Sequence, residues 1–307
     1  MITLKVFMKR IVREKWLHLM VLPTVIFYII FAYYPMYGII IAFKNFSFTK
    51  GILGSPWAAN NGFEHFINFF NSMYFSRLIS NTVILSALTL ICSFPVPIIF
   101  ALLLNEVTNN LYRRFVQSVS YFPYFVSVVI TVGIMTMLLN PTDGVINRIM
   151  ELFGGETVAF MSTRNWFRPL YIISDIWQGF GWGSILYMAA LSGVSAELYE
   201  AAVIDGANRL RQVWHVSLPG ILPTIVIMLI LAIGRLFEVG ADKILLMYSP
   251  GIYDVADVID TYVFRKSIGD AQFSFATAIN LFKNVISFSL IFFVNRISNK
   301  VSSVSLW

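Results

Sequence analysis

The stretch GVSAELYEAAVIDGANRLRQVWHVSLPG occupies residues 193–220 and separates two apolar runs. Ser195 is placed to cap a short helix, and the carboxylates of Glu197 and Glu200 favour the positive end of that helix. Four residues share one face at helical spacing: Leu198, Ala201, Ala202 and Asp205. The two adjacent alanines keep this face low in relief, so it can lie closely in the groove of a partner.

A turn and a second short helix follow. Gly206 allows a turn that a side chain would resist. We expect the second helix over 208–216, until Pro219 and Pro223 redirect the chain into the next apolar run. The stretch therefore predicts a helix-turn-helix that displays small residues and carboxylates.

The composition around this stretch excludes an ordinary soluble domain. Of 307 residues, 58% are hydrophobic and only 12% are charged, whereas a soluble domain carries about 25% charged residues. The single cysteine, Cys92, excludes an internal disulfide and a thiolate metal cluster, and the three scattered histidines offer no metal site. The net charge is +6, and its basic cluster is best explained by a cytoplasmic flank, so we expect no nucleic-acid partner. That cluster consists of Lys5, Lys9, Arg10, Arg13 and Lys15.

Six segments are long and apolar enough to cross a bilayer, which takes about 20 residues. The first lacks Asp, Glu, Lys and Arg for 28 residues, which is too long for the core of a cleaved signal peptide. The predicted spans are about 16–43, 78–105, 115–140, 169–192, 220–241 and 273–295. We therefore expect an all-α membrane protein with a single transmembrane domain over 16–295.

The orientation follows from the basic residues near the spans. The predicted inner segments are 1–15, about 105–118, 193–219 and 296–307. They hold eleven Lys and Arg against nine in the outer loops, and the N-terminal cluster decides the direction. Both ends are expected in the cytoplasm, with the helix-turn-helix at the inner face of the membrane.

The helix-turn-helix resembles the signature loop of permeases from binding-protein-dependent ABC importers. The residues that carry the resemblance are Glu200-Ala201-Ala202, Asp205-Gly206-Ala207 and Leu218-Pro219, at the family's spacing. Trp214 departs from the phenylalanine that relatives more often have, but it keeps an aromatic ring. Two further segments, YYPMYGIIIAFKNF at 33–46 and FEVGADKILLMYSP at 237–250, look like the carbohydrate branch of maltose-type and multiple-sugar permeases.

The resemblance implies the type I ABC importer permease fold and a multi-pass subunit of the bacterial cytoplasmic membrane. The loop 193–219 would be the coupling helix that sits in a cleft of the ATPase. The implied partners are a second permease, two ATP-binding subunits, an extracytoplasmic solute-binding protein and the lipid bilayer. This chain lacks a GxxxxGK[ST] phosphate loop, so it is expected to be no enzyme and to bind no cofactor. ATP and Mg would belong to the ATPase subunits.

A substrate path is predicted on the fourth span. Asp175, Gln178, Gly179 and Trp182 lie at i, i+3, i+4 and i+7, on one helix face that suits sugar hydroxyls and the apolar side of a pyranose. In maltose-type permeases, residues at similar distances before the signature glutamate line the sugar site. The alternative is structural, with Asp175 paired inside the bundle and Trp182 packed against lipid or a neighbouring helix.

Three further ionisable residues stand within predicted spans, where burial is costly. Arg235 and Glu238 are three apart on the fifth span and can form an intrahelical ion pair that lines the path or holds helices together. Lys283 on the sixth span could partner Asp175 or Glu238, or it could have a structural role.

Two other functions fit parts of the sequence. An ABC permease for a non-sugar solute would share the signature loop. A secondary transporter driven by an ion gradient, from a different class, would explain spans with embedded charges but leaves the long inner loop unexplained. The sequence therefore predicts, first, an ABC importer permease for a sugar or oligosaccharide.

Overall fold

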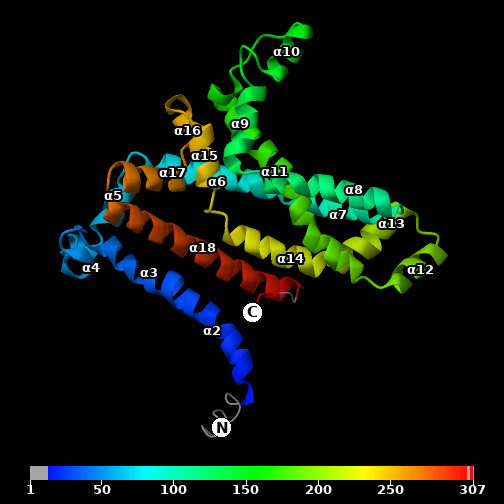
Figure 1. Cartoon of the computed structure of the whole chain (residues 1–307), viewed down its shortest axis with the longest axis horizontal. Helices are drawn as coiled ribbons and strands as arrows, with labels where there is room; N and C mark the ends of the chain where they lie inside the picture. The colour runs from blue at the N-terminus through cyan, green and yellow to red at the C-terminus, as the bar shows by residue number, and fades with distance from the viewer. Residues whose placement is uncertain (1–12, 303–304, 307) are drawn as a thin grey trace. The chain divides into compact units, whose positions relative to one another are not determined.

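A computed structural model of the chain describes residues 13–302 and 305–306. Within these residues all secondary structure is helical, apart from one isolated antiparallel bridge between Lys44 and Trp57 (Figure 1). The predicted all-α class is confirmed. Of the predicted cytoplasmic ends, Lys5, Lys9 and Arg10 and positions 303–304 and 307 lie outside the described residues.

The chain divides into two compact units. One consists of Met1–Phe69 and Lys266–Leu281, and the other of Phe70–Arg265 and Phe282–Trp307. The last helix, α18 (Phe273–Ser302), contributes residues to both units. The predicted functional residues all belong to the second unit.

The first unit begins with a helical stretch of 29 residues, Lys15–Phe43, which is apolar enough to cross a membrane. Its elements are α2 (Lys15–Tyr28), η1 (Ile29–Tyr33), α3 (Tyr34–Met36) and η2 (Tyr37–Phe43). The wide π turn η1 stands directly before Pro35. A proline ring clashes with the carbonyl four residues earlier, here that of Phe31, and a widened turn relieves the clash.

A folded loop completes the first unit. Its elements are α4 (Gly51–Gly54), η3 (Asn60–Gly62) and α5 (Glu64–Phe70). The ammonium group of Lys44 is buried and donates to the carbonyl oxygens of Ile52 at 2.9 Å and Leu53 at 2.8 Å. Lys44 thus ties the end of the first helical stretch to α4.

The second unit holds most of the helices. In chain order they are α6 (Phe75–Ser93), α7 (Pro95–Asn105), α8 (Asn110–Tyr121), η4 (Phe122–Phe125), α9 (Val128–Leu138), α10 (Val145–Leu152), η5 (Phe160–Ser162), α11 (Arg164–Ser192), α12 (Ala196–Ile204), α13 (Arg209–Gln212), η6 (Val213–Ser217), α14 (Leu218–Gly234), α15 (Ala241–Met247), η7 (Pro250–Ile252), α16 (Tyr253–Ala256) and α17 (Ile259–Phe264). The π turn η8 (Arg265–Gly269) then leads towards α18.

Four helices in the described part of the chain are long and apolar enough to span a membrane. They are Lys15–Phe43, Phe75–Asn105, Arg209–Gly234 and Phe273–Lys300. A fifth span results if α8 and α9, which are bent by 97° at a short break, are counted together. Helix α11, predicted as the fourth span, has 29 residues but is not among these apolar helices.

The third predicted span is broken because the backbone leaves the helix at Val126, which is extended with φ −76° and ψ 128°. Pro123 precedes this break, and the hydroxyl of Ser127 accepts a hydrogen bond from the amide of Ile130 at 3.3 Å. Since a serine cap starts a new helix, α9 begins in a new direction. The sequence run 115–140 is therefore two helices and not one.

Helix α11 is the centre of the second unit and packs against α6, α7, α8 and α14. Gly181 makes the approach to α8 possible, because a Cβ atom there would lie only 2.0 Å from the carbonyl oxygen of Ser120. Two buried apolar clusters flank α11. One contains Phe167 and Tyr171 of α11, and the other contains Tyr187 and Leu191.

Candidate functional site

The predicted helix-turn-helix is present. The hydroxyl of Ser195 accepts a hydrogen bond from the amide of Glu197 at 3.2 Å, so Ser195 caps α12 as predicted. Helix α12 ends in a turn in which Gly206 has φ +73°, a conformation that glycine adopts without strain. The amide of Ala207 donates to the carbonyl of Ala202 at 2.8 Å and closes the turn.

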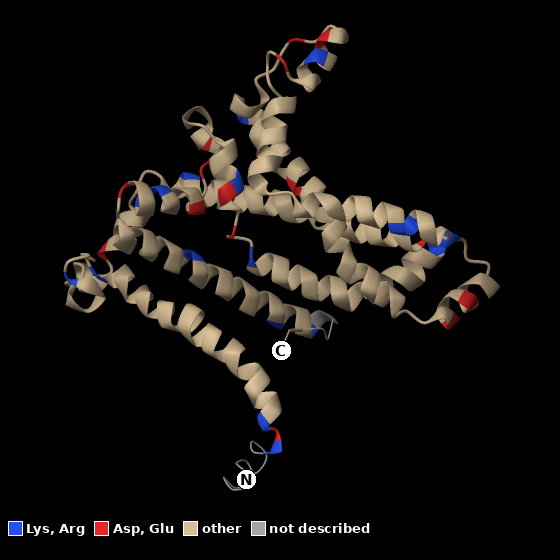
Figure 2. Cartoon of the chain, in the orientation of Figure 1, with Lys and Arg blue, Asp and Glu red and all other residues tan. Residues whose placement is uncertain are grey.

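Helix α12 is exposed, with no buried residue along its length. Its small-residue face borders a groove of about 420 Å³, the α12 groove. The groove is lined by Leu198, Ala201, Ala202, Asp205, Ala207, Arg211, His215 and Val216. Acidic residues lie on α12 and basic residues on α8 and α13, whereas the long helices carry few charged residues along their length (Figure 2). The shared face that the spacing predicts is therefore an open surface.

The second helix differs from the prediction. It does not end at residue 216 but continues through Leu218 and Pro219 as one stretch, Arg209–Gly234. Pro219 sits in the first turn of α14, directly after the wide π turn η6, which makes room for the proline ring. The tyrosine hydroxyl of Tyr199 lies 2.9 Å from the hydroxyl of the buried Ser217, which fixes α12 to this continuous helix.

A second feature is a cavity of about 350 Å³, the α6–α11 cavity. It is lined by Ser86, Thr89, Leu90, Ser93, Phe94, Pro97, Tyr171, Asp175, Ile176, Gly179, Phe180, Ala232, Arg235, Leu236, Glu238 and Val239. Four of the six residues predicted for the substrate path meet here: Asp175, Gly179, Arg235 and Glu238. The lining mixes apolar surface, three charged groups and hydroxyls.

The other two predicted path residues lie elsewhere. Gln178 donates from its amide nitrogen to the carbonyl of Val126 at 2.8 Å. Trp182 stacks on Tyr124 with ring centroids 4.7 Å apart and 5° between the ring planes. Since Val126 and Tyr124 belong to the break between α8 and α9, this pair of α11 residues holds the bent segment in place. The predicted face is thus divided between a cavity and a packing contact.

Arg235 and Glu238 are not on a helix, because α14 ends at Gly234. The amide of Glu238 donates to the carbonyl of Arg235 at 2.8 Å within the turn that follows. The predicted intrahelical ion pair is therefore wrong, and the described chain places no carboxylate within ion-pair distance of Arg235. Gly234 itself packs so closely on Ile291 that a Cβ atom would lie 2.1 Å from that side chain.

The predicted partners of Lys283 are also wrong. Its ammonium group forms an ion pair and a short hydrogen bond with Asp260 of α17. Burial raises the pKa of Asp260, and the hydrogen bond and charge of Lys283 oppose that shift. The pair is structural, since it joins α17 to α18 and neither residue lines the cavity.

Lys243 of α15 contacts Tyr171, which is one of the residues that line the cavity. It is buried, and its ammonium group donates to the carbonyl of Tyr171 at 3.1 Å and lies 4.6 Å from the centre of the Tyr171 ring. Burial lowers the pKa of Lys243 to about 8, and the negative charge of Asp175 acts in the opposite direction. This role was not predictable from the sequence, because Lys243 stands in a segment expected to be an outer loop.

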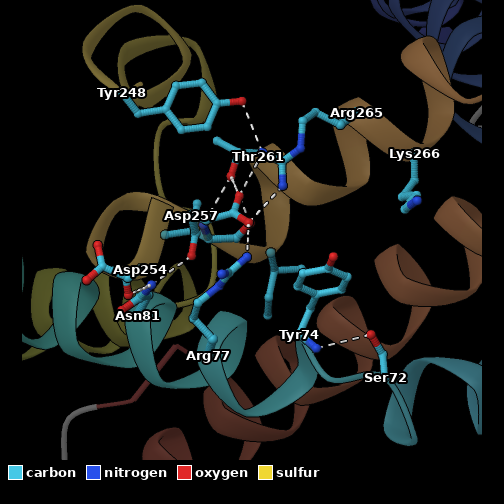
Figure 3. Close-up of polar contacts among 12 residues, drawn as sticks. Ser72, Tyr74, Arg77, Asn81, Tyr248, Asp254, Asp257, Thr261, Arg265 and Lys266 are labelled. Carbon is cyan, nitrogen blue, oxygen red and sulfur yellow. Dashed lines mark hydrogen bonds and ion pairs between the residues drawn. The ribbon is translucent and has the colours of Figure 1, made fainter. Parts of the chain in front are cut away.

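A polar cluster around Asp257 fixes the segment between α15 and α18 to α6 (Figure 3). Asp257 is fully buried and accepts two hydrogen bonds from Arg265, at 2.8 and 2.7 Å, and one from Arg77 at 3.2 Å. Asn81 donates to the carbonyls of Asp254 and Asp257, both at 3.0 Å. Sequence reasoning missed this cluster because Arg77 and Asp257 are 180 positions apart.

Arg168 extends the cluster to α11 by donating to the side-chain oxygen of Asn81 at 3.0 Å. In the described residues no group of three or more His, Cys, Asp and Glu side chains could hold a metal ion. The buried carboxylate of Asp257 is thus paired with the guanidinium groups of Arg77 and Arg265, whereas Asp175, Arg235 and Glu238 line the open space of the α6–α11 cavity.

Comparison with known proteins gives a consistent result. Residues 93–303 match the family described as binding-protein-dependent transport system inner membrane component. The chain is 43% identical over 298 residues to the polygalacturonan/rhamnogalacturonan transport system permease protein YteP of Bacillus subtilis (strain 168), covering 97% of this chain and 92% of that protein. It is 42% identical to protein LplB of the same organism, over 98% of this chain and 94% of that protein.

A solved structure is also similar. It is that of a bacterial ABC transporter involved in the import of the acidic polysaccharide alginate, with a TM-score of 0.88 and 40% identity over 96% of this chain and 99% of that one. The same transporter type has been crystallised in complex with an alginate pentasaccharide-bound periplasmic protein, with a TM-score of 0.88 and 39% identity over 97% of this chain and 99% of that one.

Proposed function

Since this chain belongs to the family of binding-protein-dependent transport system inner membrane components, we propose that it forms one half of the path by which an acidic oligosaccharide enters a bacterial cell. The chain is a multi-pass permease subunit of an ABC importer and has no catalytic role of its own. The ion-gradient-driven alternative is thereby excluded.

The proposed assembly contains a second permease, two ATPase subunits and an extracytoplasmic solute-binding protein. The α12 groove supports an ATPase contact, because alanines and the carboxylate of Asp205 line it beside the basic side chain of Arg211. The coupling residues in this proposal are Glu200, Ala201, Ala202, Asp205, Gly206, Ala207, Leu218 and Pro219. The periplasmic protein in the alginate complex supports a binding-protein partner.

We propose six spans in the bacterial cytoplasmic membrane, with both ends in the cytoplasm. The fourth of them is α11, whose 29 residues make a helix of about 43 Å, longer than the roughly 30 Å of a hydrocarbon core. Its Asp175 does not face lipid but lines the cavity. A charged residue turned towards an internal cavity is compatible with a transmembrane helix. The segments 1–15, 193–219 and 296–307 are cytoplasmic in this proposal.

The observation that carries the substrate class is Arg235, an exposed cation that lines the α6–α11 cavity without an ion-pair partner in the described chain. A uronic acid presents one carboxylate on each sugar ring, and an arginine guanidinium binds a carboxylate through two parallel hydrogen bonds. Asp175 and Glu238 can accept hydrogen bonds from sugar hydroxyls. Gln178 and Trp182 would shape the path indirectly, by holding the break between α8 and α9.

The test is uptake by the complete importer in proteoliposomes that contain ATP. We expect ATP-dependent entry of a labelled galacturonate trisaccharide, competed by other uronate oligosaccharides more strongly than by a neutral galactose trisaccharide. Arg235→Gln should lower uptake of the uronate about tenfold or more, since a charge-assisted hydrogen bond contributes about 1.5–3 kcal/mol. Arg114→Gln, which removes an exposed arginine that is not part of the cavity lining, is the control. Equal preference for both trisaccharides, with Arg235→Gln without effect, would contradict the acidic-saccharide proposal.

A further inference from the structure

Three hydroxyl side chains form a row on α6. Ser86, Thr89 and Ser93 are separated by three and four residues, so they lie on one face of the helix. All three line the α6–α11 cavity. The row extends about 10 Å along the helix axis, given a rise of about 1.5 Å per residue.

The hydroxyl oxygens of this row are buried and have no hydrogen-bond partner within the described chain. Ser86 as a whole is only 8% exposed. An unpaired buried hydroxyl is costly, because it loses its bonds to water without replacement. Such a group in a native protein calls for a partner from outside the chain.

A buried hydroxyl without a partner also occurs at Ser287 of α18, but several other helical Ser and Thr residues of the same protein behave differently. Their hydroxyls donate to a carbonyl of the preceding turn, as Thr136 does to Val132 at 2.9 Å and Ser289 does to Val285 at 2.7 Å. Thr82, one turn before Ser86 on α6 itself, donates to Leu78 at 2.7 Å. This local bond is the usual way to satisfy a hydroxyl within a helix. The three cavity hydroxyls do not use it.

The opposite side of the cavity leaves room for a ligand. Gly179 of α11 has no atom within 4 Å of the position that a Cβ would take. Asp175 and Arg235 lie on the same lining as the hydroxyl row. A polar molecule in this space would thus meet hydroxyls on one side and charged groups on the other.

We propose that Ser86, Thr89 and Ser93 bind the hydroxyl and ring oxygens of the saccharide as it passes through the permease. Each hydroxyl both donates and accepts a hydrogen bond, which matches the mixed donors and acceptors along a sugar chain. The length of the row is comparable to a disaccharide, so successive contacts can be exchanged as the substrate moves. This inference rests on the proposed function and adds α6 to a path that sequence reasoning placed only on the fourth and fifth spans.

The test compares a triple variant, Ser86→Ala, Thr89→Val and Ser93→Ala, with a double control, Thr136→Val and Ser289→Ala, in the complete importer. We expect the triple variant to take up the galacturonate trisaccharide about tenfold more slowly at low concentration. Its thermal stability and co-purification with its partner subunits should be unchanged or improved, because hydroxyls without partners contribute nothing to folding. The control should transport like the wild type. Thr89→Ser, which keeps the hydroxyl, should restore most of the uptake lost in Thr89→Val.

Each other outcome has a defined meaning. Wild-type uptake by the triple variant would overturn the inference and leave the proposed function intact, since the hydroxyls would then meet only water. Loss of the partner subunits from the triple variant would also overturn it, because the row would then be a contact between chains. Absence of saccharide uptake by the wild-type importer would overturn both the inference and the proposed function.

Discussion

The α12 groove draws all of its lining from residues 198–216, whereas the α6–α11 cavity combines side chains of α6, α11 and the turn after α14. The groove is open and combines three alanines of α12 and the turn with larger side chains, among them Arg211 of α13 and His215 of η6. The cavity lining includes Arg235 and three hydroxyls that have no partner in the described chain, whereas in the Asp257 cluster the buried carboxylate is paired with Arg77 and Arg265. This difference supports the two proposed roles, contact with another protein for the groove and passage of a polar molecule for the cavity.

The largest expected effect concerns the turn beside the groove. Gly206→Pro should abolish uptake, because proline fixes φ near −65° where Gly206 has +73°, and it removes the amide that donates to Val203. Glu200→Lys should do the same by reversing the charge on the exposed face of α12. Gly206→Asn is the matched control, since asparagine tolerates positive φ. Uptake and substrate binding to the solute-binding protein are measured together, and only uptake should be lost. Normal uptake by Gly206→Pro would show that this turn has no coupling role.

The second expected effect concerns the stability of the protein and tests whether the Asp257 cluster, unlike the cavity, holds the fold together. Asp257→Asn should destabilise the protein by about 3–5 kcal/mol, because it leaves Arg265 and Arg77 without their buried partner. Asp254→Asn is the control on the same segment. It breaks an exposed ion pair with Arg164, and such pairs contribute about 0–1 kcal/mol. Thermal unfolding of the purified importer compares the two variants, and similar midpoints would contradict a framework role for Asp257.

A smaller effect distinguishes the two parts of the predicted α11 face. Asp175→Asn should slow uptake about tenfold by weakening an acceptor for sugar hydroxyls, without loss of stability. Trp182→Ala should instead lower stability by about 1–2 kcal/mol, because it removes the stacking contact with Tyr124. Transport and thermal unfolding are measured on both variants. The reverse pattern would mean that the path runs along Trp182 and not through the cavity.

The smallest effect is the pH dependence of Lys243. Its pKa is lowered to about 8 by burial, against 10.5 for an unperturbed lysine. Between these values the unfolded state binds more protons, so stability should rise with pH in this window. We expect the wild type to gain about 1 kcal/mol from pH 7 to pH 9 relative to Lys243→Met. Parallel stability curves for the two proteins would show that Lys243 is not buried in the assembled importer.

The local features of the fold follow from the sequence. The Ser195 cap, the Gly206 turn and the shared face of Leu198, Ala201, Ala202 and Asp205 were all predictable, because each depends on neighbours within one or two helical turns. The continuation of the second helix through Pro219 was not. A proline normally indicates that a helix ends. Here the helix continues because the π turn η6 before Pro219 makes room for the proline ring.

The cavity was predictable only in part. The sequence indicates Asp175, Arg235 and Glu238 as charged residues in apolar segments. Whether they line the same cavity depends on where α14 ends and on how α6 packs against α11. The sequence does not indicate a binding role for Ser86, Thr89 and Ser93, because serine and threonine are ordinary residues in helices. Only the structure shows that their hydroxyls are unpaired. The Asp260–Lys283 pair and the Asp257 cluster were missed for a related reason, since nothing in a sequence specifies which distant charges meet.

The most direct test of the cavity as the saccharide path is to block it. Gly179→Cys on a Cys92→Ala background places a thiol in the α6–α11 cavity, where the space beside residue 179 is open. Gly133→Cys on the same background is the control, because the space beside Gly133 on α9 is equally open and lies outside the cavity lining. After treatment with a bulky thiol reagent, ATP-driven uptake of the galacturonate trisaccharide should be lost in Gly179→Cys and retained in Gly133→Cys. Full uptake by labelled Gly179→Cys, with the label confirmed by mass spectrometry, would contradict the account.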